Sequence, residues 1–440
     1  MNKNHVTIFI LCIFGPILAL IGCRGDKPNE PVDPEPQNRP PEIHISSPNN
    51  GASFKIGDYI DFEAIAVDPE EGTLTGNSIV WTSNKDGRIG SGISFTRDDL
   101  SVNQHTITAT AFDSAGASSS DVITISITAY FELVGEYSTS GAANDVYVRD
   151  SHAFLADDSG FYVVNVSNPA TPSLDSYTPT DLPASHVLVN DNYAYLTVMD
   201  YTYTPFAGSL LVFDISNLAS PALVGHYDSL VNVTDICAWG SYLYVSQDVG
   251  LKDVLILDIA NPASPQTAGI WDSYGSHANA VYAYNGLLFV VLDGFAIELE
   301  ILDIGANPTQ PPRASAIDLP WGNTETPRDV FVSESRAYLA TGTWRTGTVW
   351  VYDVADPGNP NLISFPSASG IAGRVCVSDD HIFVLQLGES GSTYDNLEVV
   401  SHSANPAFRL STNAHNIFAV GSLVFVADGN SGLRIVRFEP

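Results

Sequence analysis

Short apolar runs separated by turns recur along residues 130–440. The run VLILDIANP (254–262) has counterparts elsewhere in the chain. The strands that these counterparts predict end at Asn165, Asp214, Asp303 and Asp353. Two further apolar runs precede it, DICA and YLYVSQ. A fourth run, such as ALVGHY, follows the third after a turn that contains proline. The four runs together form one repeating unit. Nearly continuous apolar runs of this length predict strands that are buried on both faces.

The unit of four runs occurs seven times, and successive copies of the third run end 44 to 50 residues apart. A single four-stranded sheet cannot bury both of its faces, so this period predicts blades that stack around an axis as a β-propeller. The last unit stops after its third run, whereas FELVGEY (131–137) has the fourth-run pattern. We therefore expect the first strand to complete the last blade and to close a seven-bladed ring over residues 130–440.

Residues 43–129 show strict alternation instead of continuous apolar runs. YIDFEAIAV (59–67) and HTITATAF (105–112) alternate apolar with polar residues, and clusters such as DPEEG and NKDG separate the runs. This pattern predicts a sandwich of two sheets, with Trp81 in the core between them. The fold class predicted for the whole chain is therefore all-β: a β-sandwich followed by a seven-bladed β-propeller.

Two resemblances follow from these runs. VLILDIANPASP, LVFDISNLASP, YLYVSQ and GLRIV resemble the LVIVD-repeat proteins, which are secreted or envelope β-propellers of bacteria. PPEIHISSPNNGASFKIGDYIDFEAIAVDPEEG, with WTSNKDG, resembles the Ig-like, PKD-like or cadherin-like modules of bacterial surface proteins. The resemblances imply a fold and a compartment but no common activity, so function has to be argued from a site.

The N-terminus predicts export and anchoring. One basic residue precedes an apolar run from Val6 to Ile21, and residues 1–22 have the pattern of a signal peptide. Leu20 to Cys23 resembles a lipobox, which implies a lipid on Cys23 and attachment to a membrane through that lipid. The Pro-rich stretch 23–42 predicts an extended linker. We expect a protein of the bacterial cell envelope, at the outer membrane or cell surface.

The amino-acid composition restricts the kinds of partner that the chain is expected to bind. The chain has 18 Lys and Arg against 50 Asp and Glu, and such an acidic surface repels phosphate backbones, so nucleic-acid binding is not expected. Cys237 and Cys376 occupy equivalent positions three units apart, too far for a disulfide, so both thiols should be free and buried. The chain contains no HExxH, GxSxG, CxxC or P-loop motif, and no catalytic residue is assigned.

The best candidate binding surface lies where the first strands of the units begin. In a propeller those strands line the central channel, and their first residues lie near one mouth of it. The alternative role of such polar residues is to hydrogen-bond neighbouring blades. The candidates are Asn144, Asp145, His186, Asp235, His277, Asn279, Arg328, Asp329, Arg374, His415 and Asn416.

A calcium site in the sandwich is a second candidate. Asp68, Glu70 and Glu71 follow one strand and Asp113 follows another, at loops expected on the same end, and Ca²⁺ prefers clustered oxygen ligands. The alternative is a solvated turn. Apart from calcium, no cofactor is expected.

Three classes of function remain open for the propeller. The first is non-catalytic binding of a glycan or protein partner. The second is an enzyme, a polysaccharide hydrolase or lyase, with its active site at a channel mouth. The third is a structural scaffold of an envelope complex.

Overall fold

The computed structural model describes residues 37–439, except 203, 249–252, 274–275, 294–296, 321–324, 344–345, 388–395, 401–406 and 411–413. The predicted signal peptide and the lipidated Cys23 lie outside these residues. The chain divides into two compact units, one of 1–49, 61–95 and 106–123 and one of 50–60, 96–105 and 124–440. Within the described part, no helix is long and apolar enough to cross a bilayer.

Residues 42–128 form two sheets. The first has the order β1-β3-β4 with β7 paired to β3, and the second has the order β2-β9-β8-β5-β6. Trp81 is fully buried, its ring packs edge-on against Phe62 and Phe95, and its Nε1 donates to the Gly92 carbonyl at 2.9 Å. Trp81 is therefore a core residue, as predicted. The elements are β1 (Glu42–Ser47), β2 (Ala52–Lys55), β3 (Ile60–Asp68), β4 (Gly72–Thr73), the 3-10 turn η1 (Gly76–Ser78), β5 (Ile79–Ser83), β6 (Gly87–Ser91), β7 (Ser94–Arg97), β8 (Asn103–Phe112) and β9 (Ser118–Thr128).

From β10 onward, the described strands form seven sheets, which we number 1 to 7 in chain order. Sheet 1 contains β11 (Ala143–Arg149), β12 (His152–Asp157), β13 (Gly160–Asn165) and β14 (Ser173–Pro179). Sheet 2 contains β15 (Ala184–Asn190), β16 (Tyr193–Asp200), β17 (Ala207–Asp214) and β18 (Ala222–Val231). Sheet 3 contains β19 (Val233–Trp239), β20 (Tyr242–Gln247), β21 (Val254–Asp258) and β22 (Gln266–Trp271). Sheet 4 contains β23 (Ala278–Tyr284), β24 (Leu287–Leu292), β25 (Leu299–Asp303) and β26 (Arg313–Ile317).

The remaining three sheets complete the ring. Sheet 5 contains β27 (Thr326–Ser333), β28 (Arg336–Gly342), β29 (Gly347–Asp353), β30 (Asn361–Ser364) and β31 (Ser367–Ala368). Sheet 6 contains β32 (Ile371–Ser378), β33 (His381–Leu387), β34 (Asn396–Val399) and β35 (Ala407–Arg409). Sheet 7 contains β36 (Asn416–Val420), β37 (Leu423–Ala427), β38 (Leu433–Phe438) and β10 (Phe131–Tyr137).

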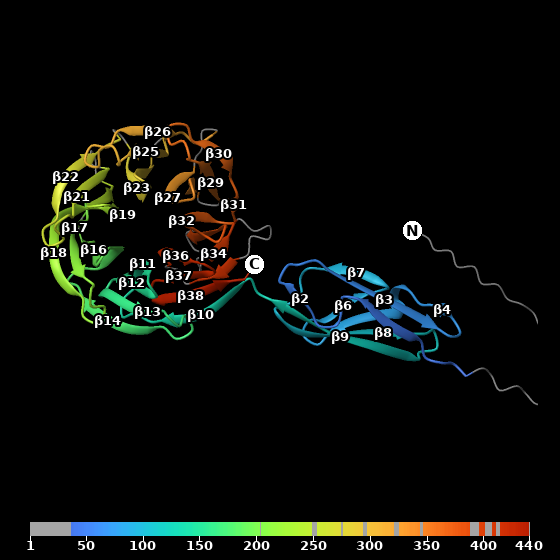
Figure 1. Cartoon of the computed structure of the whole chain (residues 1–440). Helices are drawn as coiled ribbons and strands as arrows, with labels where there is room; N and C mark the ends of the chain where they lie inside the picture. The colour runs from blue at the N-terminus through green and yellow to red at the C-terminus, as the bar shows by residue number, and fades with distance from the viewer. Residues whose placement is uncertain are drawn as a thin grey trace, which may run out of the picture. The chain divides into compact units, whose positions relative to one another are not determined.

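The sheets are arranged around a centre as a β-propeller, with the first strand of each sheet innermost (Figure 1). Each pair of neighbouring sheets shares an apolar cluster; the seam between sheets 1 and 2, for example, contains Phe154, Phe161 and Phe213. Such clusters occupy every seam of the described ring. The third strands β13, β21 and β25 are buried along almost their whole length, as their continuous apolar runs predict.

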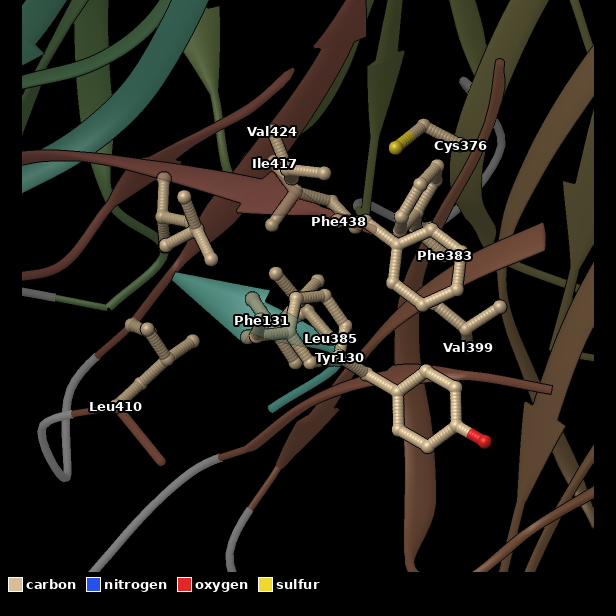
Figure 2. Close-up of a cluster of buried hydrophobic side chains, with 14 residues drawn as sticks. Tyr130, Phe131, Cys376, Phe383, Leu385, Val399, Leu410, Ile417, Val424 and Phe438 are labelled. Carbon is tan, nitrogen blue, oxygen red and sulfur yellow. The ribbon is translucent and has the colours of Figure 1, made fainter. Parts of the chain in front are cut away.

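The first strand of the ring pairs with its last strand, as predicted. β10 runs antiparallel to β38, and the register joins Phe131 to Phe438 and Tyr137 to Leu433. Phe438 packs at 5.2 Å from the Phe131 ring and at 5.8 Å, edge-on, from Phe383 of sheet 6 (Figure 2). The closing strand is therefore fixed both by its hydrogen bonds to β38 and by the core between sheets 6 and 7.

The repeated phrase, Asp-Ile-Ala-Asn-Pro in sheet 3, builds a similar turn after the third strands of sheets 1 to 5. In sheet 3, Asp258 accepts a hydrogen bond from the Ala260 amide at 2.9 Å, and Asn261 accepts one from the Ala263 amide at 3.3 Å. Ile259 is buried, and its amide donates to the Ser241 carbonyl at 2.8 Å. Asp and Asn recur here because their short side chains satisfy the backbone of the turn.

The glycine of the LVG-Y phrase allows neighbouring sheets to approach. A Cβ atom placed on Gly225 of sheet 2 would lie 2.1 Å from the Pro262 carbonyl oxygen in the turn of sheet 3. A Cβ atom placed on Gly135 of the closing strand would lie at the same distance from the Pro169 carbonyl oxygen of sheet 1. In sheet 4 a serine occupies the position, and Ser315 Oγ donates to the Pro357 carbonyl of sheet 5 at 2.6 Å. The position therefore admits glycine or serine; Ser315 bonds the approaching carbonyl, whereas the buried Ser176 Oγ at the equivalent position of sheet 1 has no hydrogen-bond partner among the described residues.

Replacing Gly135 by alanine is expected to lower the free energy of unfolding by about 1–3 kcal/mol, because the new methyl group must push away a backbone carbonyl that cannot rotate aside. Chemical denaturation measures the change. Gly358→Ala is the matched control, since its Cβ would meet only the Asp356 carboxylate at 3.4 Å. Equal stability of the two variants would contradict the close-contact role of Gly135.

Candidate functional site in the central channel

A β-bulge is repeated at the start of the innermost strands. In the pairing of β11 with β12 the register shifts between Ala143 and Asp145, which leaves Asn144 as an extra residue. The same shift occurs in sheets 2 to 6. A bulge changes the direction of the side chains around it, so the side chains of two consecutive residues can bond different groups of the neighbouring sheet.

The extra residue bonds the next sheet. Asn144 Nδ2 donates to the Ala184 carbonyl at 2.8 Å, Thr234 Oγ1 to the Ala278 carbonyl at 2.7 Å, and Asn279 Nδ2 to the Pro327 carbonyl at 2.7 Å. Asn144 and Asn279, which the sequence suggested as binding residues, therefore have a structural role between sheets.

The aspartate after the bulge also reaches the next sheet, in alternate units. Asp145 accepts from the Val187 amide at 2.8 Å, Asp235 from the Val281 amide at 3.1 Å, and Asp329 from the Val375 amide at 2.8 Å. In sheet 7, Asn416 Nδ2 donates to Asp145 Oδ1 and so joins the last unit to the first. These carboxylates hold main-chain amides that would otherwise lack a partner at the channel wall.

Five predicted candidates meet in one cavity. A cavity of about 350 Å³ lies in the channel and is lined by the innermost strands of all seven sheets. The polar residues in its wall are Asp145, Asp235, Asp329, Arg374 and Asn416. Its other large side chains, which the sequence analysis did not propose as site residues, are Tyr147, Leu188, Tyr282, Phe331 and Phe418. They all occupy the third position of the innermost strand, two residues after the polar position.

The carboxylates outnumber the cations in this cavity. Arg374 Nη1 lies 3.6 Å from Asp329 Oδ1. Burial lowers the pKa of Arg374, but the charges of Asp329, Asp235 and Asp145 more than offset it and leave the pKa above its ordinary value. Three carboxylates around one guanidinium leave the cluster with excess negative charge.

The excess negative charge bears on the ionisation of Asp235. Burial raises its pKa to about 7, Arg374 opposes the shift, and the charges of Asp329 and Asp145 add to it. Burial also raises the pKa of Asp145 and Asp329, against the hydrogen bonds and the Arg374 charge that favour their ionised forms. Near neutral pH, both the protonated and the ionised form of Asp235 therefore occur.

Both thiols in the cavity wall are inert. Cys237 and Cys376 are free and buried, as predicted. Burial, with the neighbouring Asp235 and Asp329 charges, raises the pKa of each thiol, so neither forms a thiolate near neutral pH.

The three candidate histidines do not converge in the cavity. His186 is buried, with Nδ1 3.2 Å from Ser185 Oγ, and burial followed by the Arg374 charge lowers its pKa to about 3. It is neutral and does not line the cavity. His277 and His415 are exposed, and His277 Nδ1 lies 3.2 Å from Asp248 Oδ1. Arg328 is half-buried and is also absent from the cavity lining.

The carboxylates proposed for calcium are engaged in turns. Asp68 Oδ1 accepts from the Glu70 and Glu71 amides at 2.8 Å, and Asp113 accepts from the Ala117 amide at 2.8 Å. Glu71 accepts from the Ser114 amide at 2.9 Å, so the two loops do lie at the same end. Across the described residues, no group of three or more His, Cys, Asp or Glu is placed to hold a metal ion. These carboxylates thus form turn hydrogen bonds, while Asp68 Oδ2 is buried without a hydrogen-bond partner in the part of the chain that the structure describes, and the calcium site stays a prediction.

Stability is expected to depend on pH through Asp235. Because the folded-state pKa is raised to about 7, the folded protein binds a proton that the unfolded chain releases, so this residue's contribution favours folding less as pH rises from about 4 to 7. Asp235→Asn removes that titration. In denaturation experiments, the free energy of unfolding of the original protein minus that of Asp235→Asn should fall as pH rises from about 4 to 7. A difference that stays constant over this pH range would contradict the raised pKa.

Comparison with known proteins supports the fold. The LVIVD repeat family model matches residues 140–179, 183–229 and 232–273, which cover sheets 1 to 3. The chain has no significant match among curated proteins.

Among solved structures of low sequence identity, a WD40 β-propeller domain shares the fold, and others resemble the chain more weakly. The WD40 β-propeller domain of Doa1 is 7% identical, with a TM-score of 0.51 over 70% of this chain and 97% of that one. Virginiamycin B lyase from Staphylococcus aureus is 10% identical, with a TM-score of 0.49 over 70% of this chain and 100% of that one. The extracellular domain of a putative one-component system from B. thetaiotaomicron is 10% identical, with a TM-score of 0.48 over 71% of this chain and 40% of that one. The chain is therefore a repeat β-propeller protein that carries LVIVD repeats.

Proposed function

We propose that this chain is a lipid-anchored protein of the bacterial cell envelope, at the outer membrane or cell surface. Its seven-bladed propeller would bind a glycan or protein partner without chemical conversion. The domains would be a signal peptide (1–22), a lipidated Cys23 with a Pro-rich linker (23–42), an Ig-like or PKD-like sandwich (43–129) and the propeller (130–440). The apolar run before Cys23 supports the anchor.

The channel cavity carries the binding proposal. About 350 Å³ lies at the small end of the range for ligand sites, which suits one sugar unit or one side chain of a partner. Carboxylate and amide oxygens in its wall can accept hydrogen bonds from hydroxyl or amino groups, and the aromatic rings offer faces for the apolar side of a ligand.

The state of the polar side chains favours binding over catalysis. Asp145 and Asp329 are buried and accept hydrogen bonds from main-chain amides, which fixes them in place. The Cys237 and Cys376 thiols stay protonated and are poor nucleophiles.

One observation favours the enzyme alternative. Burial raises the pKa of Asp235 to about 7, and two further carboxylates line the same cavity. A carboxyl group with a raised pKa beside a second carboxyl group is typical of the general acid of glycosidases. A polysaccharide hydrolase or lyase is therefore the second candidate.

Incubation of the purified protein with a panel of glycans and envelope proteins distinguishes non-catalytic binding from enzyme activity. We expect a retained, unmodified ligand; release of shortened or unsaturated sugars would establish the enzyme instead. The double variant His277→Ala and His415→Ala removes exposed side chains that directly precede innermost strands. Loss of one hydrogen bond of about 1 kcal/mol should weaken retention about fivefold. His226→Ala, on the outer strand β18, is the control, and equal loss in the control would contradict binding at the mouth.

The anchor is tested separately. Replacing Cys23 by serine should abolish incorporation of labelled fatty acid and move the protein from the membrane fraction to the soluble fraction. Continued lipid labelling of the Cys23→Ser variant would show that Cys23 is not the attachment site.

A further inference from the structure

We propose that the channel cavity recognises a small organic cation, an ammonium group carried on a short apolar stem. This inference rests on the proposed binding function, because it names the chemical class of ligand for the same cavity. Four observations carry it: the charge balance of the wall, the placement of aromatic rings, the size of the cavity and the way that its carboxylates are held.

The cavity wall carries more carboxylates than cations. Asp145, Asp235 and Asp329 share the cavity with one guanidinium, that of Arg374. The ion pair there joins Arg374 to Asp329, while Asn416 donates a neutral hydrogen bond to Asp145. Asp235 accepts hydrogen bonds from the Ile236 and Val281 amides, neither of which brings a full charge. A ligand with one positive charge would offset the excess at Asp235.

Aromatic rings line the same cavity beyond the carboxylates. Tyr147 lies 5.1 Å from Phe418 between ring centroids, and Tyr282 lies 5.2 Å from Phe331. All four rings belong to innermost strands and face the cavity. Aromatic faces attract a desolvated cation within about 6 Å and also accept the methylene groups beside it. The carboxylate end and the aromatic region together match a molecule with a charged head and an apolar stem.

The size and rigidity of the cavity fit such a ligand. A volume of about 350 Å³ holds a small molecule or the end of a side chain rather than a folded partner. The carboxylates are held by amides of neighbouring sheets, so they need little reorganisation when a cation arrives.

Cation binding should exchange with a proton. Without a ligand, Asp235 compensates the excess charge by taking up a proton near pH 7. The charged groups that act on it are Arg374, Asp329 and Asp145, while His186 on the adjacent inner strand stays neutral. A bound ammonium group adds a positive charge, stabilises the Asp235 carboxylate and expels that proton.

The test is calorimetric titration of the purified protein with n-butylamine at about pH 7, with n-butanol as the neutral probe of similar shape. We expect the amine to bind at least tenfold more tightly than the alcohol. In two buffers of different ionisation enthalpy, the heats of amine binding should differ because binding releases protons, fewer than one per molecule. Equal affinity for amine and alcohol, or binding without proton release, would overturn the proposal, and neither measurement needs a variant.

Asp235→Asn should weaken butylamine binding about tenfold and abolish proton release. Asp150→Asn removes a carboxylate at an exposed hairpin outside the cavity and should leave both unchanged. Equal effects in the two variants would assign the attraction to the overall negative charge and refute the site. A glycan or protein that is retained at the mouth while butylamine does not bind would refute this inference alone. Failure of both would also end the proposed function.

Discussion

The structure depends on the burial of both faces of every four-stranded sheet. A sheet whose strands are apolar on both sides is stable only between two neighbours, and a row of such sheets has no neighbour at its ends. The pairing of β10 with β38 removes the ends, because Phe131 and Phe438 then complete the core between sheets 6 and 7. The cavity exists because that closure brings seven innermost strands around one axis.

Much of this arrangement could be predicted from local sequence. The period of the repeated turn phrase set the units, and residues such as Asp258 and Asn261 recur because each satisfies its own turn. The pairing of the ends followed from one strand pattern at residues 131–137 and its absence after the last unit. Position in the repeat was also enough to predict that Cys237 and Cys376 stay free.

The site was harder to predict because a β-bulge decides which neighbour each side chain reaches. Asn144 and Asp145 are adjacent in sequence, yet one bonds a carbonyl and the other an amide of sheet 2. No composition rule signals such a bulge, and His186 at the equivalent position ends in a buried pocket instead of the channel. The aromatic residues at the third position of the innermost strands can be recognised in the sequence. Their position in the repeat does not show by itself that their side chains line a cavity.

The closing strand also has a mechanical consequence. β10 follows directly on the residues that lead from the N-terminal sheets, so a force transmitted through the preceding chain would reach the ring at Phe131. Removing that strand would break the backbone hydrogen bonds that join Phe131–Tyr137 to β38. The strand that connects the ring to the preceding chain is thus the strand that closes it.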